Sequence, residues 1–167
     1  MASKLIDICS YAKGKTAVAK LTAKNYISTE NMLSNKGGIT IATNLPSVDQ
    51  TQEYKKNDVL VSNIRPYFKK IWHAEYDGGC SNDVLVFRAA EGIDSTFLYY
   101  VLADDAFFNY ATATSKGTKM PRGDKGAIME YAVPAFDVET QRKIGALLRG
   151  IDQKIAINSK INDNLAA

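Results

Sequence analysis

The chain has 167 residues, of which 46% are apolar, so it is long enough for one domain with a hydrophobic core. Nine tyrosines and six phenylalanines argue against an intrinsically disordered chain, because disordered sequences are poor in aromatic residues. Two cysteines and one histidine are too few and too widely separated for a structural zinc site. The apolar runs are too short to span a bilayer. The first residues lack the apolar stretch of a signal peptide, so we expect a cytoplasmic protein.

The net charge of +3 is small, but the charges are unevenly distributed along the chain. Basic residues gather in 1–25, 55–73 and 114–126, whereas 74–105 contains seven acidic residues and one basic residue, Arg88. A chain with this distribution is able to fold with one positive and one negative face. A positive face suits a polyanion such as nucleic acid, and we expect the acidic segment to form a solvated face.

The first half of the chain favours short strands. Residues 1–8 are expected to form one helical turn. A strand is predicted at Ile39–Ala42, followed by a polar turn around Pro46. The clearest strand predictions are the β-branched runs "DVLVS" at 58–62 and "DVLVF" at 83–87.

The following segments change to helical periodicity. Phe97, Leu98, Val101 and Leu102 form a helical stripe that Asp94 or Ser95 is able to cap. Asp104 or Asp105 is expected to start a second short helix. The segment "AIMEYAVPAF", 127–136, predicts one more strand, which Pro134 closes.

The C-terminal segment favours one long helix, for which Asp137 is a suitable N-cap and Glu139 suits the first turn. Apolar and asparagine residues then recur at spacings of four and three, which is typical of a coiled-coil seam. The seam consists of Ile144, Leu148, Ile151, Ile155, Asn158, Asn162 and Leu165. A helix of about 30 residues extends about 45 Å. We therefore favour pairing with a partner helix, and a helix lying flat on its own domain is the alternative.

Catalytic motifs are not found in the sequence. There is no Gly-x-Gly-x-x-Gly loop and no Walker loop, and the pairs Gly37-Gly38 and Gly78-Gly79 are typical of turns. His73, the only histidine, lies among apolar neighbours and is expected to pack or to contact a phosphate. We therefore expect neither an enzyme nor a cofactor. A small metal-dependent nuclease that uses the acidic residues of 74–105 stays open as an alternative.

Three segments combine cationic, polar and aromatic residues, which is a mixture suited to DNA. Arginine and asparagine pair with guanine and adenine edges, whereas lysine suits phosphate because it is a point charge on a flexible stem. The candidate DNA-binding residues are Asn63, Arg65, Tyr67, Lys69, Lys70, Lys116, Thr118, Lys119 and Arg122. A third segment adds Tyr26, Ser28, Thr29 and Asn31. The alternative without DNA is a protein-only adaptor that recruits a partner through its C-terminal helix.

The order of these segments resembles the specificity (S) subunit of type I restriction-modification systems. The resemblance rests on "NDVLVSNIRPYFKKIW", "GGCSNDVLVFR", "FLYYVL" and "GTKMPRGDKGAIMEYAVPAFDVETQRKIGALLRGIDQKIAINSKIN". Its most specific matches are Met120-Pro121-Arg122, Val133-Pro134, Glu139 and Gln141. The departures are a single proline at the turn and Thr140 between the last two matches. It covers nearly the whole chain but only one half of such a subunit, namely a target recognition domain, 1–136, and its conserved helix, 137–167.

The resemblance implies an α+β fold, in which a mixed, mostly-β target recognition domain with short helices precedes a long C-terminal coiled-coil helix. It also implies a non-catalytic subunit that reads one half of a bipartite target in double-stranded DNA. Such a subunit docks DNA methyltransferase (modification) subunits and, through them, restriction subunits. Because this chain resembles half of one, we expect two copies to pair antiparallel through 137–167 as a homodimer that reads an inverted repeat.

Overall fold

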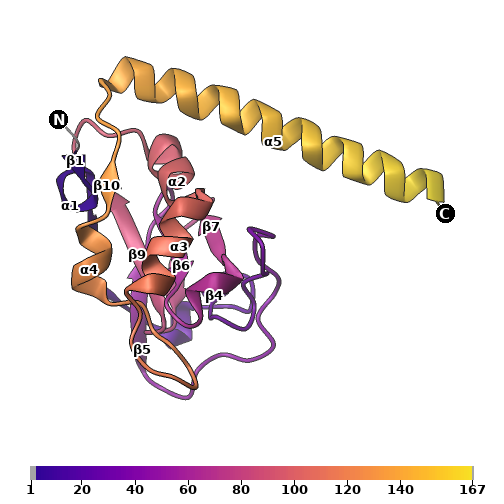
Figure 1. The fold of residues 1–167 in the computed structure, drawn as a ribbon. Helices are drawn as coiled ribbons and strands as arrows, with labels where there is room; N and C mark the ends of the chain where they lie inside the picture. Colours follow the sequence, from indigo (N-terminus) through magenta and orange to yellow (C-terminus); the bar gives the residue numbers. More distant parts are fainter. Residues whose placement is uncertain (1–2, 167) are drawn as a thin grey trace.

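A computed structural model describes residues 3–166 (Figure 1). Its central sheet has the strand order β2-β9-β6-β7, with every neighbouring pair antiparallel. These strands are β2 (Cys9–Tyr11), β6 (Val59–Ser62), β7 (Ile71–His73) and β9 (Val84–Ala89). The two predicted β-branched runs are therefore confirmed as β6 and β9, which pair with each other.

A second sheet lies against the central one and has the order β3-β5-β8-β4. Its strands are β3 (Lys15–Ala17), β4 (Tyr26–Ile27), β5 (Gln50–Tyr54) and β8 (Gly78–Cys80). The β4–β8 pair is parallel and the other two pairs are antiparallel. A short ribbon joins β1 (Ser3–Lys4) to β10 (Ala132–Val133).

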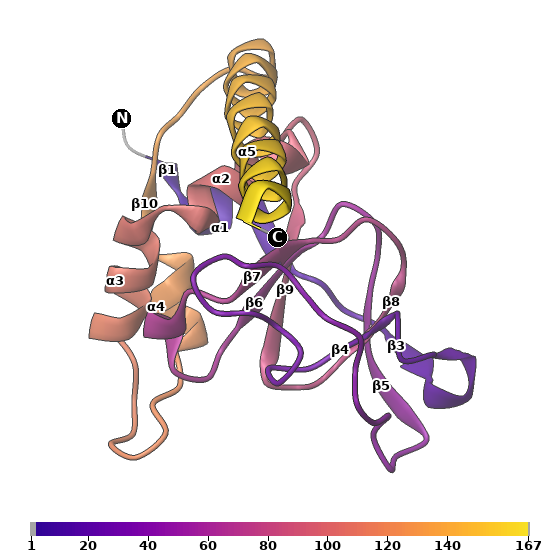
Figure 2. The same ribbon diagram turned by 90° about the vertical axis from the view of Figure 1, so that its right-hand side faces the viewer.

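Short helices cover the other face of the central sheet (Figure 2). They are α1 (Leu5–Ile8), α2 (Ser95–Ala103), α3 (Asp105–Ala113) and α4 (Lys125–Met129), and single 3₁₀ turns lie at η1 (Val18–Lys20) and η2 (Pro66–Phe68). Asp94 caps α2, Asp104 caps α3 and Asp124 caps α4, each through side-chain hydrogen bonds from backbone N–H groups. The predicted α1, α2 and α3 are therefore confirmed, and so is the α+β fold class.

The central sheet is buried on both faces, which explains why its strands are continuous apolar runs. Because side chains alternate along a strand, Val59 and Val61 pack with the helices, whereas Leu60 packs with the second sheet. In β9, Phe87 faces the helices and Val86 faces the second sheet. Two hydrophobic clusters on opposite faces of the central sheet therefore hold the domain together.

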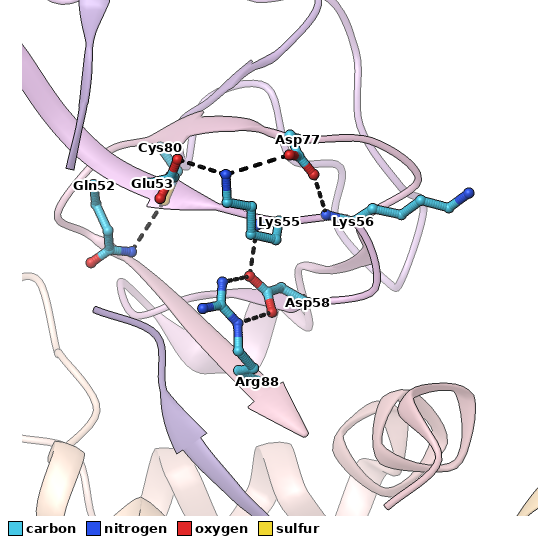
Figure 3. A network of polar contacts seen from close by, with 8 residues as sticks. All are labelled: Gln52, Glu53, Lys55, Lys56, Asp58, Asp77, Cys80 and Arg88. Atoms are coloured by element: carbon cyan, nitrogen blue, oxygen red, sulfur yellow. Dashed lines mark hydrogen bonds and ion pairs between the residues drawn. The ribbon is translucent and has the colours of Figure 1, made fainter. Parts of the chain in front are cut away.

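A polar network closes the turn between β5 and β6 (Figure 3). The guanidinium of Arg88 donates to both carboxylate oxygens of Asp58, at 2.7 and 2.8 Å, and the Asp58 side chain is 3% exposed. The backbone N–H of Lys55 also donates to Asp58, while its ammonium group pairs with Glu53 and Asp77. Arg88, the single basic residue of the acidic segment, is thus a structural residue of the sheets.

Two sequence predictions are wrong. Ile39–Ala42 is not a strand, and this segment has only an isolated bridge between Met32 and Ile39. The segment 127–136 is not one strand either, because α4 occupies Lys125–Met129 and β10 is limited to Ala132–Val133. The Asp124 cap and the burial of Ile128 in the helical core favour the helical turn there.

The last element, α5 (Val138–Ala166), is a single helix whose second half extends beyond the domain (Figure 1). The predicted cap is present, since Asp137 accepts a hydrogen bond of 2.8 Å from the N–H of Thr140. The proposed division of the chain at 136/137 stays a prediction. Among residues 3–166, no helix combines the length and apolarity needed to cross a membrane.

Candidate nucleic-acid interface

Two cationic segments that are distant in sequence lie side by side in the structure. We call 63–70 the first cationic loop and 115–123 the second. The N–H of Arg65 donates to the carbonyl of Pro121 at 2.8 Å, and the N–H of Gly123 donates to the carbonyl of Asn63 at 3.1 Å. Within the second loop, Lys116 and Arg122 exchange two backbone hydrogen bonds. The backbone thus joins both predicted loops into one surface.

Asn63 occupies the junction of the two loops and differs from the other candidates. It is 8% exposed, and its Oδ1 has no hydrogen-bond partner within residues 3–166. A Cβ atom at Gly123 would lie 2.7 Å from this oxygen, so a larger residue there would force the Asn63 side chain to move. The predicted contact of Asn63 with DNA stays a prediction, and the structure gives this residue a position inside the junction.

The first cationic loop holds an unusual backbone. Arg65 and Lys69, with φ of 49° and 52°, flank η2 in the left-handed region that side chains rarely adopt. On the neighbouring loop, Asn35 and Lys36 also have positive φ, and their N–H groups donate to the carbonyls of Phe68 and Lys69. Left-handed non-glycine residues cluster at binding and active sites, so this arrangement marks the loop as a candidate site on structural grounds.

The turn η2 presents two aromatic side chains to solvent. Tyr67 and Phe68 are exposed, and their ring centroids lie 4.9 Å apart. The ammonium group of Lys70 lies 5.8 Å from the Phe68 centroid and donates to the carbonyl of Thr29. Sequence reasoning missed Phe68, although an aromatic residue beside a proline in a polar loop was a usable signal.

Several candidate cations are paired with carboxylates. Lys69 and Lys36 both contact Asp105, at 3.1 and 2.9 Å. Hydrogen bonds from these two lysines hold the pKa of the Asp105 carboxyl below its ordinary value. The Nε and Nη2 atoms of Arg122 lie 3.2 and 3.1 Å from one oxygen of Asp83. The expected separation into a positive and a negative face is therefore wrong here, because Asp83 and Asp105 belong to the cationic surface.

The tip of the second loop is the most exposed part of this surface. It projects below α3 and α4, on the side of the domain opposite to α5 (Figures 1 and 2). Thr118 and Lys119 are exposed there, and no side-chain hydrogen bond or ion pair of Lys119 lies within the described part of the chain. Lys116 pairs with Asp124, which raises the pKa of the Lys116 ammonium group.

The third predicted segment contributes structure rather than a surface. Tyr26 and Asn31 are buried, and the Asn31 amide donates to the carbonyls of Tyr26 and Thr40. The N–H of Ser28 donates to Asn31 Oδ1 at 2.6 Å. Thr29 contacts the first cationic loop, since its carbonyl accepts a hydrogen bond from Lys70.

The predicted helix seam divides into two parts. Ile144 and Leu148 are half-buried against the domain, whereas the remaining members are exposed: Ile151, Ile155, Asn158, Asn162 and Leu165. The residues buried against α2 are instead Gln141 and Gly145. Sequence reasoning missed this second face, although a glycine within a helical pattern signals close packing.

Neither a metal-binding cluster nor an activated cysteine is found among residues 3–166. Within residues 3–166, no group of three or more His, Cys, Asp and Glu side chains is arranged to hold a metal ion. Cys9 and Cys80 are buried and free, and burial raises the pKa of each thiol to about 12. Thiols with such pKa values are poor nucleophiles at neutral pH.

Comparisons with known proteins agree with the resemblance in the sequence. The family model for the type I restriction modification DNA specificity domain matches residues 1–167. The chain is 28% identical over 118 residues to the EcoDI specificity subunit of Escherichia coli, covering 68% of this chain and 26% of that protein.

The fold is similar to solved specificity subunits. The HsdS subunit from Thermoanaerobacter tengcongensis matches with a TM-score of 0.73 and 21% identity, over 96% of this chain and 44% of that one. A chain from a structural study of complex assembly in the type I system matches with the same values. The present chain thus spans less than half the length of these relatives.

Specificity subunits of type I systems are DNA-recognition subunits without a catalytic activity of their own. The family match therefore agrees with the expectation of a non-enzymatic protein and confirms the resemblance inferred from the segments around Arg65 and Arg122. The chain belongs to the family of type I restriction modification DNA specificity domains.

Proposed function

We propose that this chain supplies one half of a specificity subunit and that its two cationic loops read one half of a bipartite DNA target. The observation that carries the proposal is the joining of 63–70 and 115–123, backbone to backbone, into one exposed cationic and aromatic surface. Family membership supplies the functional context for this surface.

The loops contain groups for two kinds of contact. Lys119 is free to follow a phosphate, since its side chain is exposed at the loop tip. Arg122 is held at both ends, by backbone bonds to Lys116 and by the Asp83 carboxylate. A side chain held in place loses less conformational entropy on binding, so Arg122 is better placed for a directional contact than the free lysine.

The exposed half of α5 supports the proposed assembly. Ile155, Ile161 and Leu165 are exposed apolar side chains on a helix that extends beyond the domain. We propose that they pair with α5 of a second copy, antiparallel, and that the paired helices dock methyltransferase subunits and, through them, restriction subunits. The assembly would work in the cytoplasm, where its DNA is accessible, and would need no cofactor in this chain.

The proposal is tested by measuring DNA binding over a range of salt concentrations. Each phosphate contact changes the slope of log K against log salt by about −0.9. Lys119→Ala should weaken binding to all sequences and reduce the slope by about one contact, whereas Arg122→Ala should cost about 1–3 kcal/mol and relax the preference at one base pair. Lys20→Ala, an exposed lysine on η1, is the matched control.

A salt-independent signal would contradict the proposal, and so would equal behaviour of Lys119→Ala and Lys20→Ala. The target itself follows from mapping methylated bases in cells that express the chain with its methyltransferase subunit. A motif that contains this chain's half-site as an inverted repeat would support the homodimer. A motif without two-fold symmetry would contradict it.

A further inference from the structure

We propose that the exposed aromatic pair of η2, Tyr67 and Phe68, reads the C5-methyl group of a thymine in the major groove of the target. The inference rests on the proposed function, because it assigns a ligand to one part of the same surface. The arginine and lysine side chains around the pair suit hydrogen-bonding groups of bases and phosphates. The aromatic pair offers an apolar contact, which is a different kind of readout.

The backbone of η2 is tied to its surroundings on both sides of the rings. The N–H of Phe68 donates to the carbonyl of Arg65 at 2.9 Å, and the carbonyl of Phe68 accepts from the N–H of Asn35 at 2.8 Å. The carbonyl of Lys70 accepts from the N–H of Ser62, in β6, at 3.1 Å. The turn therefore holds its rings outward, and turning them into the domain would break these bonds.

The two rings form one apolar patch whose outer edge is open to solvent. Tyr67 is 47% exposed and Phe68 is 39% exposed. Their ring centroids lie 4.9 Å apart with the planes inclined at 57°, and the Lys70 ammonium group lies 5.8 Å from the Phe68 centroid. The Phe68 side chain has no polar atom, so its exposed edge gains most from an apolar partner that displaces water.

The charges around this patch favour a DNA groove over an apolar protein surface. Arg65, Lys69 and Lys70 flank the rings in sequence, and Lys36 of the neighbouring loop contacts the same Asp105 carboxylate as Lys69. An apolar protein surface would remove water from these cations without offering them partners. The major groove has phosphates along its rims and thymine methyl groups among its base edges, so it offers partners to the cations and to the rings together.

The packing of the rings favours a methyl contact over insertion between base pairs. An aromatic side chain that enters DNA as a wedge commonly does so from the minor groove, which is about 6 Å wide when undistorted. In η2 the two rings pack on each other, so a broad apolar edge faces outward rather than a single ring. The major groove is about 12 Å wide and is able to admit such a turn.

The proposal is tested by removing the methyl group alone. Each thymine of the half-site found by methylation mapping is replaced in turn by uracil, which keeps every hydrogen-bonding group but lacks the methyl. Binding of the full chain with its methyltransferase subunit is measured by fluorescence anisotropy. One replacement should weaken binding about fourfold, as expected for one buried carbon. At that position, 5-methylcytosine should bind about fourfold tighter than cytosine, because the methyl group returns.

Protein variants assign this effect to η2. Phe68→Ala should bind the thymine and uracil DNAs equally, whereas Phe68→Leu keeps an apolar contact and should retain most of the difference. Ile41→Ala is the matched control, since Ile41 is an apolar residue outside both cationic loops and is 64% exposed. It should discriminate as wild type does. Thermal unfolding of each variant verifies that the fold is intact.

Several results would overturn the proposal. One is a half-site without thymine on either strand, and another is equal binding of all thymine and uracil DNAs by the wild-type chain. The latter, combined with weak binding by Phe68→Ala, would indicate a wedge. A difference that persists in Phe68→Ala would place the methyl contact elsewhere. All of these leave the proposed function standing, whereas a wild-type chain without sequence-specific binding would overturn the proposed function and this inference with it.

Discussion

The two halves of α5 share one helical pattern but have different surroundings. The first half, 138–152, packs on α2 through buried and half-buried residues, and its contacts are largely polar. In the second half, 153–166, every residue is exposed, and apolar side chains such as Ile155 and Leu165 are 58% and 80% exposed. The same periodicity therefore describes a helix that packs on its own domain at one end and exposes its apolar residues at the other.

This contrast arises because only the first half of the helix lies on the domain, where the seam residues Ile144 and Leu148 are also half-buried. Gln141, Gly145 and Asp152 point toward α2, and at 3.6 residues per turn Ile155 lies about 60° and Ile151 about 100° from their centre around the axis. The arrangement that the sequence offered as the alternative, a helix lying on its own domain, is thus present in the first half, whereas pairing with a partner helix stays a prediction.

The second half of α5, 153–166, should control self-association. Ile155→Glu combined with Leu165→Glu should weaken dimerisation at least 100-fold, about 3 kcal/mol, because two carboxylates would be buried in the seam. Sedimentation equilibrium measures the dissociation constant. Lys160→Glu, on the opposite side of the helix, should change it little, and the thermal unfolding of the domain should not respond to either change. A wild-type chain that stays monomeric at high concentration would show that the exposed stripe serves another partner.

The first half of α5, 138–152, should instead control the stability of the fold. Gly145→Leu should lower the free energy of unfolding by about 2 kcal/mol, because the side chain overpacks the contact with Thr96 and Phe97. Gly150 is the matched control, since nothing lies within 4 Å of a Cβ atom there. Gly150→Leu should be neutral or stabilising through helix propensity. Urea denaturation compares the two, and equal effects would mean that the helices do not approach closely in solution.

The buried amide of the first half should have a smaller effect. Gln141→Ala removes the partners of the Asp94 N–H and the Phe136 carbonyl and should destabilise the fold by about 1 kcal/mol. Gln153→Ala, in the second half, should stay within about 0.5 kcal/mol of wild type. Loss of stability in both variants by the same amount would contradict the division of the helix.

The smallest predicted effect is a pH dependence of folding stability through His73, whose Nδ1 lies 3.3 Å from Nη2 of Arg149 on α5. Burial and then the Arg149 charge lower the pKa of His73 below its ordinary value, although Asp94 and Glu75 oppose the shift. Because the pKa of His73 is lowered in the folded state, the unfolded chain binds the proton more readily. The free energy of unfolding is therefore highest above about pH 6.5, the ordinary pKa of histidine, and decreases as the pH falls below it. The Ser95 hydroxyl and the Tyr99 ring also contact the His73 ring.

This dependence is measured by thermal unfolding at pH 7 and pH 5.5 for wild type and His73→Gln. The unfolding temperature of wild type should fall more than that of the variant over this range. The depressed carboxyl pKa values of Asp105 and Asp124 act at lower pH in both proteins. Parallel curves would show that His73 does not couple to folding.

Local sequence signals predicted the elements that depend on local physics. The β-branched runs became β6 and β9, and the aspartates before α2, α3 and α5 became their caps. The strand predictions at 39–42 and 127–136 failed for a different reason, since contacts with distant segments helped to decide the structure of both. The exposed Phe68 and the burial of Gln141 against α2 were missed for the same reason.

In the candidate site, too, some features were predictable from the sequence and others were not. The chemistry of the loops was readable, because arginine, lysine and proline in a polar segment have the same meaning wherever they lie. Their neighbours were not readable. Nothing in the order of residues places Arg65 against Pro121, or Asp83 against Arg122, since these pairs are distant in sequence.

The sequence by itself determined the two β-branched strands, the helix caps, the periodicity of α5 and the family of the chain, because each depends on residues that are neighbours along the backbone. Only the tertiary structure decided that two cationic loops form one surface, that carboxylates pair with its cations, and that α5 uses one face for its own domain. Those features depend on contacts between distant segments, which the cooperative packing of two hydrophobic clusters on either side of one sheet brings together.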